Sequence, residues 1–328
     1  MTAGRQLGLF DPPAAKDAHA ADRELMRHVP AWLCFGTSSW TFPGWAGLVY
    51  EGRPSERELA ERGLEEYARH PLFRGVGIDR SYYAPLDAAT LARYRAQLPA
   101  GFRWVMKAFA GITSAVHPRT RDPNPHFLDA ERCAKEVLEP VLEHFSEHSG
   151  KVVFELMPLR PGELPEPSAF AERLAAFLGR LPPELSYAVE LRNRELLTHR
   201  YVQALQSAGA GHVFSYWERM PTLAEQLDVP GALLGDVVVA RLLIPPGQRY
   251  EARKRRLAPF DRIVDPREDM RADVMRLARA CELLGKVLLV IVNNKAEGSS
   301  PLTVRALAER WVREASDPPP DGLDDYPH

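Results

Sequence analysis

Short apolar runs of strand length alternate with segments of helical periodicity along most of the chain. Eight of these runs are nearly continuous in apolar residues, as is typical of a parallel sheet that is covered on both faces. The predicted strands are Trp32–Thr37, Gly75–Asp79, Phe102–Ala108, Val152–Leu156, Tyr187–Leu191, His212–Tyr216, Val237–Leu243 and Val287–Val292. Eight strand–helix units without a glycine-rich phosphate loop favour an α/β fold, a single (β/α)8 TIM barrel, over an open doubly wound sheet.

The segments between the strands carry helix signals. Ser55 and Glu58 have the spacing of a capping box, which predicts the start of a helix. A later apolar stripe reaches Leu284 and is followed by Gly285, a residue that commonly ends helices. The last helix is predicted to begin at Pro301, because proline favours the first helical position.

Composition changes at both ends of this pattern. Residues 1–30 and 316–328 are rich in Pro, Asp, Ala and His and lack periodicity. We therefore expect a disordered N-terminal arm over residues 1–30, a barrel domain over residues 31–315 and a disordered tail over residues 316–328.

Charge and cysteine usage narrow the class of protein. A formal net charge of −2 argues against a protein that coats long nucleic acid, so any such contact must be local. Cys34, Cys133 and Cys281 lie far apart, and we interpret them as buried and reduced in a cytoplasmic protein. No apolar run reaches membrane-spanning length, so no membrane partner is expected.

Polar residues gather where the predicted strands end, which is where barrels of this kind build their active sites. The residues at these ends are Trp40, Asp79, Tyr82, Tyr83, Lys107, Glu155, Glu190, Arg192, Arg241, Asn293 and Asn294.

Seven segments around these strand ends resemble one known family. They are FGTSSWTFPGWAGLVY (35–50), GIDRSYYAP (77–85), FRWVMKAFAGIT (102–113), VVFELMPL (152–159), YAVELRNRE (187–195), VVARL (238–242) and VLLVIVNN (287–294). In this order they are similar to the YecE-like proteins, bacterial TIM barrels without an established biochemical role, over residues 32–312. The resemblance implies that Trp40, Tyr83, Lys107, Glu190, Arg192 and Asn294 occupy recurring polar positions of that family. The family tends to have Glu at the position of Gly77 and Asn at that of Asp79, so the chain is a divergent member.

The charged strand ends are candidate catalytic residues. Lys107 could act as a nucleophile or a fixed cation, although an ion pair with Glu155 or Glu190 is the more ordinary role. The two glutamates could divide general acid and base work, or hold a divalent metal ion with Asp79. Glu190 and Arg192 point to the same side of their strand, and a purely structural pair between them is an equal alternative.

An anion site is predicted at the last two strands. Arg241, Asn293 and Asn294 lie there, and Ser300 precedes a helix whose free amides would attract a phosphate. Ordinary capping by Ser300 is the alternative. The aromatic residues of the mouth, Trp40, Tyr82 and Tyr83, could stack on a base or sugar, or fill the core. The basic run at residues 249–256 could contact nucleic acid, or form a solvated helix face.

The N-terminal arm carries the apolar peptide QLGLF. Gln6, Leu7, Leu9 and Phe10 resemble the short peptide by which bacterial repair and replication proteins bind the DNA sliding clamp. Such a peptide on a disordered arm would fold as it binds. In the alternative, the same side chains cover the protein's own barrel.

These observations lead to three hypotheses about function. The first is an enzyme, phosphodiesterase-like or isomerase-like, that acts on a phosphate-bearing substrate in nucleic-acid processing or repair. The second is an enzyme that acts on a sugar phosphate or carboxylate, and the third is a binding protein without catalysis. The first two rest on analogy with other barrels.

Overall fold

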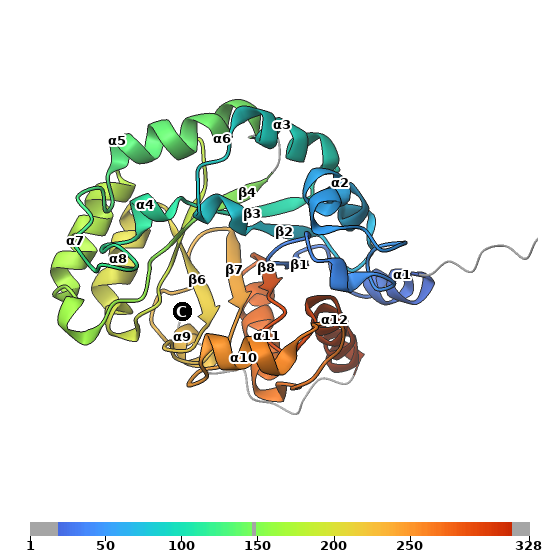
Figure 1. Ribbon diagram of the computed structural model, residues 1–328. Helices are drawn as coiled ribbons and strands as arrows, with labels where there is room; N and C mark the ends of the chain where they lie inside the picture. The colour runs from blue at the N-terminus through green and yellow to red at the C-terminus, as the bar shows by residue number, and fades with distance from the viewer. Residues whose placement is uncertain (1–18, 146–148, 317–328) are drawn as a thin grey trace, which may run out of the picture.

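The computed structural model describes residues 19–145 and 149–316, and within them the eight predicted strands close into one parallel barrel (Figure 1). The strands follow one another around the barrel in chain order, and β8 pairs with β1 to close it. The strands are β1 Leu33–Thr37, β2 Gly75–Ile78, β3 Arg103–Lys107, β4 Gly150–Glu155, β5 Tyr187–Glu190, β6 Gly211–Tyr216, β7 Val237–Leu242 and β8 Val287–Val292. The predicted barrel is confirmed, with strand ends that differ by one or two residues.

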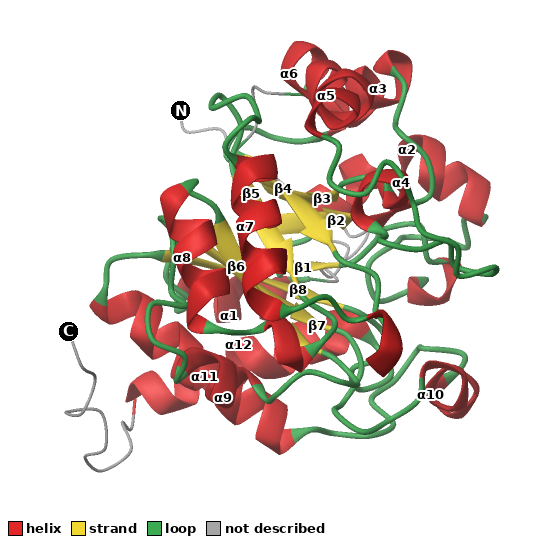
Figure 2. Cartoon of the chain, turned by 90° about the vertical axis from the view of Figure 1, so that its left-hand side faces the viewer, coloured by secondary structure: helices red, strands yellow, loops and turns green. Residues whose placement is uncertain are grey.

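Helices surround the barrel (Figure 2). They are α1 Ala20–Arg27, α2 Glu56–Arg69, α3 Ala88–Gln97, α4 Ala110–Thr113, α5 Ala130–Cys133, α6 Glu139–His144, α7 Pro167–Leu178, α8 His199–Ser207, α9 Leu223–Leu227, α10 Tyr250–Leu257, α11 Glu268–Leu283 and α12 Ser300–Ser316. The predicted capping box of Ser55 and Glu58 opens α2. The stripe of α11 ends one turn earlier than predicted, because Leu284 is 56% exposed.

Part of the predicted disordered N-terminal arm is a helix. Residues 20–27 form α1, which packs against α12 instead of being disordered. Arg305 of α12 holds both carboxylate oxygens of Asp22 at 2.8 Å, and Met26 is buried. The sequence pattern did not predict this helix, because it has too few apolar positions to show a helical period. The peptide at residues 6–10 and the tail beyond residue 316 lie outside the described residues.

An apolar layer fills the middle of the barrel. Seven strands contribute its side chains, which are Cys34, Val105, Val153, Ala188, Val213, Val239, Leu289 and Ile291. The remaining strand, β2, presents glycines, and a Cβ on Gly75 would lie 2.5 Å from Leu289 Cδ1. Because successive inward-facing residues are two apart, the residues two positions before and after this layer face the two ends of the barrel.

Two further expectations concern the whole chain. Cys34, Cys133 and Cys281 are buried and free, as the sequence predicts. Within residues 19–145 and 149–316, no helix is long and apolar enough to span a membrane.

Candidate active site

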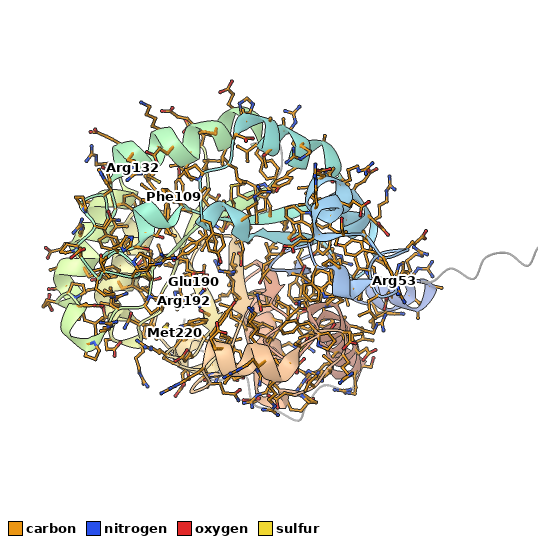
Figure 3. The ribbon with its side chains drawn as sticks, in the orientation of Figure 1. Arg53, Phe109, Arg132, Glu190, Arg192 and Met220 are labelled. Carbon is orange, nitrogen blue, oxygen red and sulfur yellow. The ribbon has the colours of Figure 1, made fainter. Side chains whose placement is uncertain are left out.

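Six charged side chains meet at the carboxyl ends of the strands. They are Asp79 directly after β2, Lys107 of β3, Glu155 of β4, Glu190 of β5, Arg192 just after β5, and Arg241 of β7. Figure 3 shows Glu190 and Arg192 beside each other in this region. Three carboxylates face three cations, so the formal charge of the group, which we call the mouth network, is zero. The network forms because these residues follow the apolar layer at inward-facing positions.

Arg241 lies at the centre of the mouth network. Its Nη1 donates to Glu155 at 2.9 Å and to Glu190 at 2.6 Å, and its Nη2 donates to both oxygens of Asp79 at 2.9 and 2.8 Å. Burial alone would lower the pKa of Arg241, but the three carboxylates outweigh burial and raise this pKa above its ordinary value. Arg241 is therefore a fixed cation whose donors on Nη1 and Nη2 are occupied.

Lys107 lies nearer the opening of the barrel. Its Nζ is 2.9 Å from Glu155 and 3.1 Å from Asp79, which confirms the predicted pair with Glu155 and adds a second partner. The amine also lies 5.2 Å from the centre of the Tyr82 ring. Burial, and then the charge of Glu155, raise the pKa of Tyr82 to about 12, so its hydroxyl keeps its proton at neutral pH.

The two glutamates differ in depth. Burial alone would raise the pKa of Glu155, but Arg192, Lys107 and Arg241 hold this pKa well below its usual value. The Glu190 side chain is 0% exposed and accepts a hydrogen bond from Ser215 Oγ at 3.2 Å. Its predicted pair with Arg192 is present at 2.6 Å. Glu190 thus lies on the floor of the site, whereas Glu155 and Asp79 lie closer to the opening.

Arg192 has donors to spare. Its Nη2 contacts Glu155 and Glu190 at 2.6 Å each, but its Nε and Nη1 have no hydrogen-bond partner among the described residues. The guanidinium lies 4.0 Å from the ring centre of Trp217, whose Nε1 is also unpartnered within the described ranges. Arg192 lines a cavity of about 190 Å³, together with Thr113 and Asn193. The side chain is only 4% exposed, so Arg192 has two buried donors for which the described residues supply no acceptor.

At the predicted anion site near the last two strands, the asparagine side chains bind groups of the chain itself. Asn294 Oδ1 accepts hydrogen bonds from Ser300 N at 2.8 Å and from Ser300 Oγ at 2.9 Å. It also accepts one from Trp45 Nε1 at 3.3 Å. Asn293 Oδ1 accepts from Lys295 N at 3.0 Å. Asn294 therefore caps the start of α12 in the place that we had assigned to a phosphate. Arg241 binds carboxylates of the chain itself and not a ligand anion.

The aromatic residues do not act together. Trp40 is 3% exposed, donates from Nε1 to the carbonyl of Leu59 at 3.0 Å and packs edge-on against Tyr94, so it belongs to the core. Tyr83 is 81% exposed. Of the three predicted stacking residues, Tyr82 alone contacts the mouth network.

The basic run forms α10, but its cations have two different environments. Arg253 is buried and donates to the carbonyl of Lys295 at 2.8 Å, to Gln248 Oε1 at 2.9 Å and to Asp265. It therefore fixes the loops after β7 and β8, which corrects its assignment to a surface. The cations that remain exposed are Arg249, Lys254, Arg255 and Arg256.

The donor set at the mouth does not fit the divalent ion that the sequence left open. Each of Asp79, Glu155 and Glu190 already contacts at least one cation, and the network is neutral without a metal. Within the described part of the chain, the metal-capable group of three lies elsewhere and consists of His19, Asp22 and His70. Arg305 occupies both oxygens of Asp22, and burial, then His19, lower the pKa of His70 to about 4.

Sequence reasoning missed Trp217 and Thr113. Trp217 directly follows the predicted sixth strand, so its place after a strand end was visible, but one tryptophan has many structural uses. Thr113 lies at the end of α4, a helix of one turn without a sequence signal. Its buried Oγ1 has no partner among the described residues and lies at the cavity beside Arg192.

Comparisons with known proteins agree with this architecture. The fold is similar to that of a DUF72 family protein from Enterococcus faecalis V583, with a TM-score of 0.58 and 17% identity over 86% of this chain and 95% of that one. It is also similar to a DUF72 family protein from Thermotoga maritima MSB8, with a TM-score of 0.54 and 17% identity over 87% of this chain and 99% of that one. A search of the curated proteins finds no match.

Identity this low shows a shared fold and leaves the activity open. The family model described as "Protein of unknown function DUF72" matches residues 34–323, which span the whole barrel. The YecE-like proteins, which the seven segments resemble, are the same family. The chain therefore belongs to the DUF72 family, as a divergent member.

Proposed function

We propose that this chain is an enzyme that binds a small anionic substrate, carrying a phosphate or a carboxylate, at the mouth of the barrel through Arg192. The observation that supports this most strongly is that Nε and Nη1 of Arg192, a side chain that is 4% exposed, have no hydrogen-bond partner among the described residues. A buried polar group without a partner costs about 1–3 kcal/mol, which an anion would recover. Each of these two N–H donors can make a charge-assisted hydrogen bond to an oxygen of a carboxylate or phosphate.

The acid–base groups of the proposed reaction are Lys107 and Asp79. The Asp79 side chain is 24% exposed and that of Lys107 is 11% exposed, whereas that of Glu190 is fully buried. Lys107 would donate a proton to, or stabilise, an oxygen that gains negative charge, and Asp79 would accept a proton. Glu190 and Arg241 act as positioning residues, since they hold these groups from below. This arrangement supports isomerase-like or hydrolase-like chemistry next to an anionic group.

The size of the cavity favours a small substrate. A volume of about 190 Å³ admits a small anion and is too confined for a nucleic-acid duplex. Of the mouth network, Arg192 alone lines this cavity, so only the part of the substrate that extends past Arg192 would meet Lys107 and Asp79. We therefore place the small-molecule enzyme first. Binding without catalysis remains the alternative if no turnover accompanies binding.

The test compares the parent protein with Arg192→Lys. Lysine keeps the positive charge beside Glu155 and Glu190 but removes the Nε and Nη1 donors. Isothermal calorimetry with inorganic phosphate and with malonate should show binding to the parent and about tenfold weaker binding to the variant, the loss of roughly one good hydrogen bond. Arg276→Lys, at an exposed pair with Asp228, is the matched control. Absent anion binding by the parent, or equal affinity of Arg192→Lys, would contradict the proposal.

Nucleic acid is a second candidate ligand, supported by the exposed cations of α10. Tyr250 on the same helix is 41% exposed, and Lys295 lies 4.5 Å from its ring centre. Replacing Arg249, Lys254 and Arg255 by Gln should weaken oligonucleotide binding and flatten its dependence on salt, because each lost phosphate contact lowers the slope by about 0.9. Fluorescence anisotropy at several salt concentrations measures both quantities.

The control for this experiment removes the same number of charges from another helix. Arg57, Arg62 and Arg69 are exposed on α2, and their replacement by Gln should leave binding unchanged. Equal losses in the two triple variants would indicate attraction to net charge only, and a parent protein that binds no oligonucleotide would exclude this ligand.

A partner is proposed for the N-terminal peptide on the basis of its sequence. Gln6, Leu7, Leu9 and Phe10 match the pattern of peptides that bind the bacterial sliding clamp, and a tether to the clamp would raise the local DNA concentration. A peptide of residues 1–15 should bind the clamp of the same organism. A peptide with Leu9→Ala and Phe10→Ala should not bind, and failure of the parent peptide at tens of micromolar would exclude this partner.

A further inference from the structure

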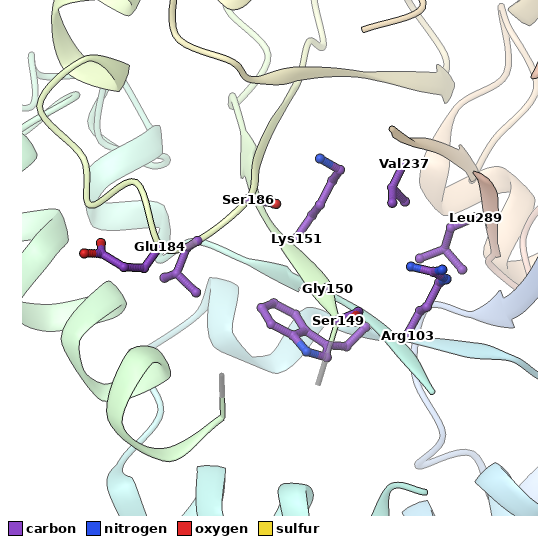
Figure 4. A pocket seen from close by; sticks show the side chains of 10 residues that line it. Arg103, Ser149, Gly150, Lys151, Glu184, Ser186, Val237 and Leu289 are labelled. Atoms are coloured by element: carbon purple, nitrogen blue, oxygen red, sulfur yellow. The ribbon is translucent and has the colours of Figure 1, made fainter. Parts of the chain in front are cut away.

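The opposite end of the barrel has a polar layer of its own. Arg103 of β3 and Lys151 of β4 lie two residues before Val105 and Val153, which belong to the apolar layer. Both charged residues therefore face inward at the amino ends of the strands. A cavity of about 270 Å³ opens between them, and Figure 4 shows their side chains among those that line it. We call this cavity the basal pocket.

Lys151 is buried in the basal pocket without a counterion. The residue is 6% exposed, and within residues 19–145 and 149–316 its amine makes no hydrogen bond or ion pair but remains within reach of solvent. Burial lowers the pKa of Lys151, and the more distant Asp236 opposes this effect only in part. Burying an ammonium group without a partner is costly, so an anion next to it would recover free energy.

The other groups around the basal pocket add positive potential. Arg103 is half-buried and lies close to Cys34. Burial raises the pKa of the Cys34 thiol, and the positive charge of Arg103 opposes this rise. The guanidinium makes no ion pair with a described carboxylate. Glu184 is the acidic residue of the lining, and Figure 4 shows its side chain directed away from Lys151.

We propose that the basal pocket binds a small dianion, a phosphate monoester or a dicarboxylate, between the amine of Lys151 and the guanidinium of Arg103. A planar fork and a point charge together suit a dianion. The Ser186 hydroxyl is a further donor at the rim, and the Trp104 ring forms a wall. The volume of the pocket admits a small molecule.

This site is separate from the mouth network. The apolar layer lies between the two, so a ligand in the basal pocket cannot reach Lys107 or Arg192. Among the described residues that line the basal pocket, Glu184 is the acidic one, and its side chain is directed away from the cations. Its occupant is therefore a bound effector or a stabilising ligand and not the substrate of the mouth.

The experiment measures thermal unfolding of the full chain in inorganic phosphate and in succinate, at an ionic strength held constant with sodium chloride. Both anions should raise the melting temperature of the parent protein as they bind the folded state. Lys151→Met has a similar volume without the charge, and we expect its apparent affinity for the anions to fall by about tenfold or more. Its melting temperature without anions should equal or exceed that of the parent, because a buried charge is removed.

Two further variants make the outcome unambiguous. Lys151→Arg keeps the cation and should retain the response even if Lys151→Met fails to fold. Arg192→Lys should lose only the share of the response that anion binding at the mouth contributes, whereas Lys151→Met should lose the share of the basal pocket, which distinguishes this proposal from the proposed function. A response to one anion only identifies the class of ligand. No response in the parent, or an unchanged response in Lys151→Met, would overturn the proposal.

Discussion

Removing Arg241 should expose how strongly the mouth network depends on charge balance. Arg241→Met keeps much of the side-chain volume but takes one cation from a group of three carboxylates and three cations. Each carboxylate keeps a contact, since Lys107 remains beside Asp79 and Glu155, and Arg192 beside Glu155 and Glu190. The network nevertheless acquires a net charge of −1 in a site where Arg241 and Glu190 are 0% exposed.

The expected cost follows from this geometry. Breaking a buried ion pair by removing one partner typically costs about 3–5 kcal/mol, and we expect the free energy of unfolding of Arg241→Met to fall by that amount. Glu190→Gln in the same chain restores two carboxylates against two cations. The double variant should therefore regain about 2 kcal/mol relative to the sum of the two single effects. Arg241→Lys, which keeps the charge but loses the two-pronged contact with Asp79, should be less destabilised than Arg241→Met.

Urea unfolding at neutral pH measures these differences for the parent, Arg241→Met, Glu190→Gln, the double variant and Arg241→Lys. Acidification adds an independent check. The pKa of Glu155 is held well below its ordinary value of 4.5, so its contribution to stability is present above that pH and is lost as the pH falls through the folded-state value. Arg241 is one of the causes of that lowering, so less stability remains to be lost in Arg241→Met. The gap between parent and variant should narrow on acidification. A variant within about 1 kcal/mol of the parent, or effects that simply add, would refute the reasoning.

Three other predictions concern residues outside the mouth network. Burial lowers the pKa of His212 from 6.5 to about 4. Neutral His212 therefore contributes its full stabilisation at pH values above 6.5, the pKa of the unfolded state. Up to roughly 3 kcal/mol of stability is lost as the pH falls from 6.5 to about 4. His212→Asn should flatten that part of the curve of stability against pH. Asn294→Ala should cost about 1–2 kcal/mol in thermal or urea unfolding because Ser300 loses its cap, whereas Asn294→Asp keeps the acceptor and should cost less. Gly36→Ala should destabilise by more than about 2 kcal/mol, because its Cβ would lie 2.1 Å from a backbone oxygen, whereas Gly162→Ala, with nothing within 4 Å, serves as the neutral control.

The barrel could be predicted from the sequence because its cause is local. A parallel strand covered on both faces must be apolar at almost every position, so each strand is visible as a short apolar run. The order of the strands then follows from the alternation with helices, which leaves few topologies. Helix α1 was not predicted because its cause is not local. It is held by Arg305 and Arg74, which lie far along the chain, and not by a pattern of its own.

The candidate site could be predicted only in its composition. Strand ends place Lys107, Glu155 and Arg241 at one end of the barrel, and all three are found there. Which of them contact each other depends on how far a side chain reaches across the barrel, and residues on β7 and β2 are not neighbours in the sheet. Arg241 spans this gap to Asp79, which no periodicity encodes. The role of Asn294 could not be predicted for the same reason, since its side chain turns back to cap the helix that follows.

The buried cations of the barrel therefore differ in how many of their donor nitrogens lack a partner among the described residues. Arg241 has given both terminal nitrogens to carboxylates, and Lys107 lies between two of them. Arg192 uses one nitrogen of three, and Lys151 contacts no carboxylate within the described ranges. A buried donor without an acceptor lowers the stability of the protein, and a ligand that supplies the acceptor would recover that free energy. Arg192 is the cation with two such donors, Nε and Nη1, whereas Lys151 is a buried cation that faces a pocket without a described carboxylate partner. If both proposals hold, the apolar layer between the two sites would keep their anions from repelling each other at close range.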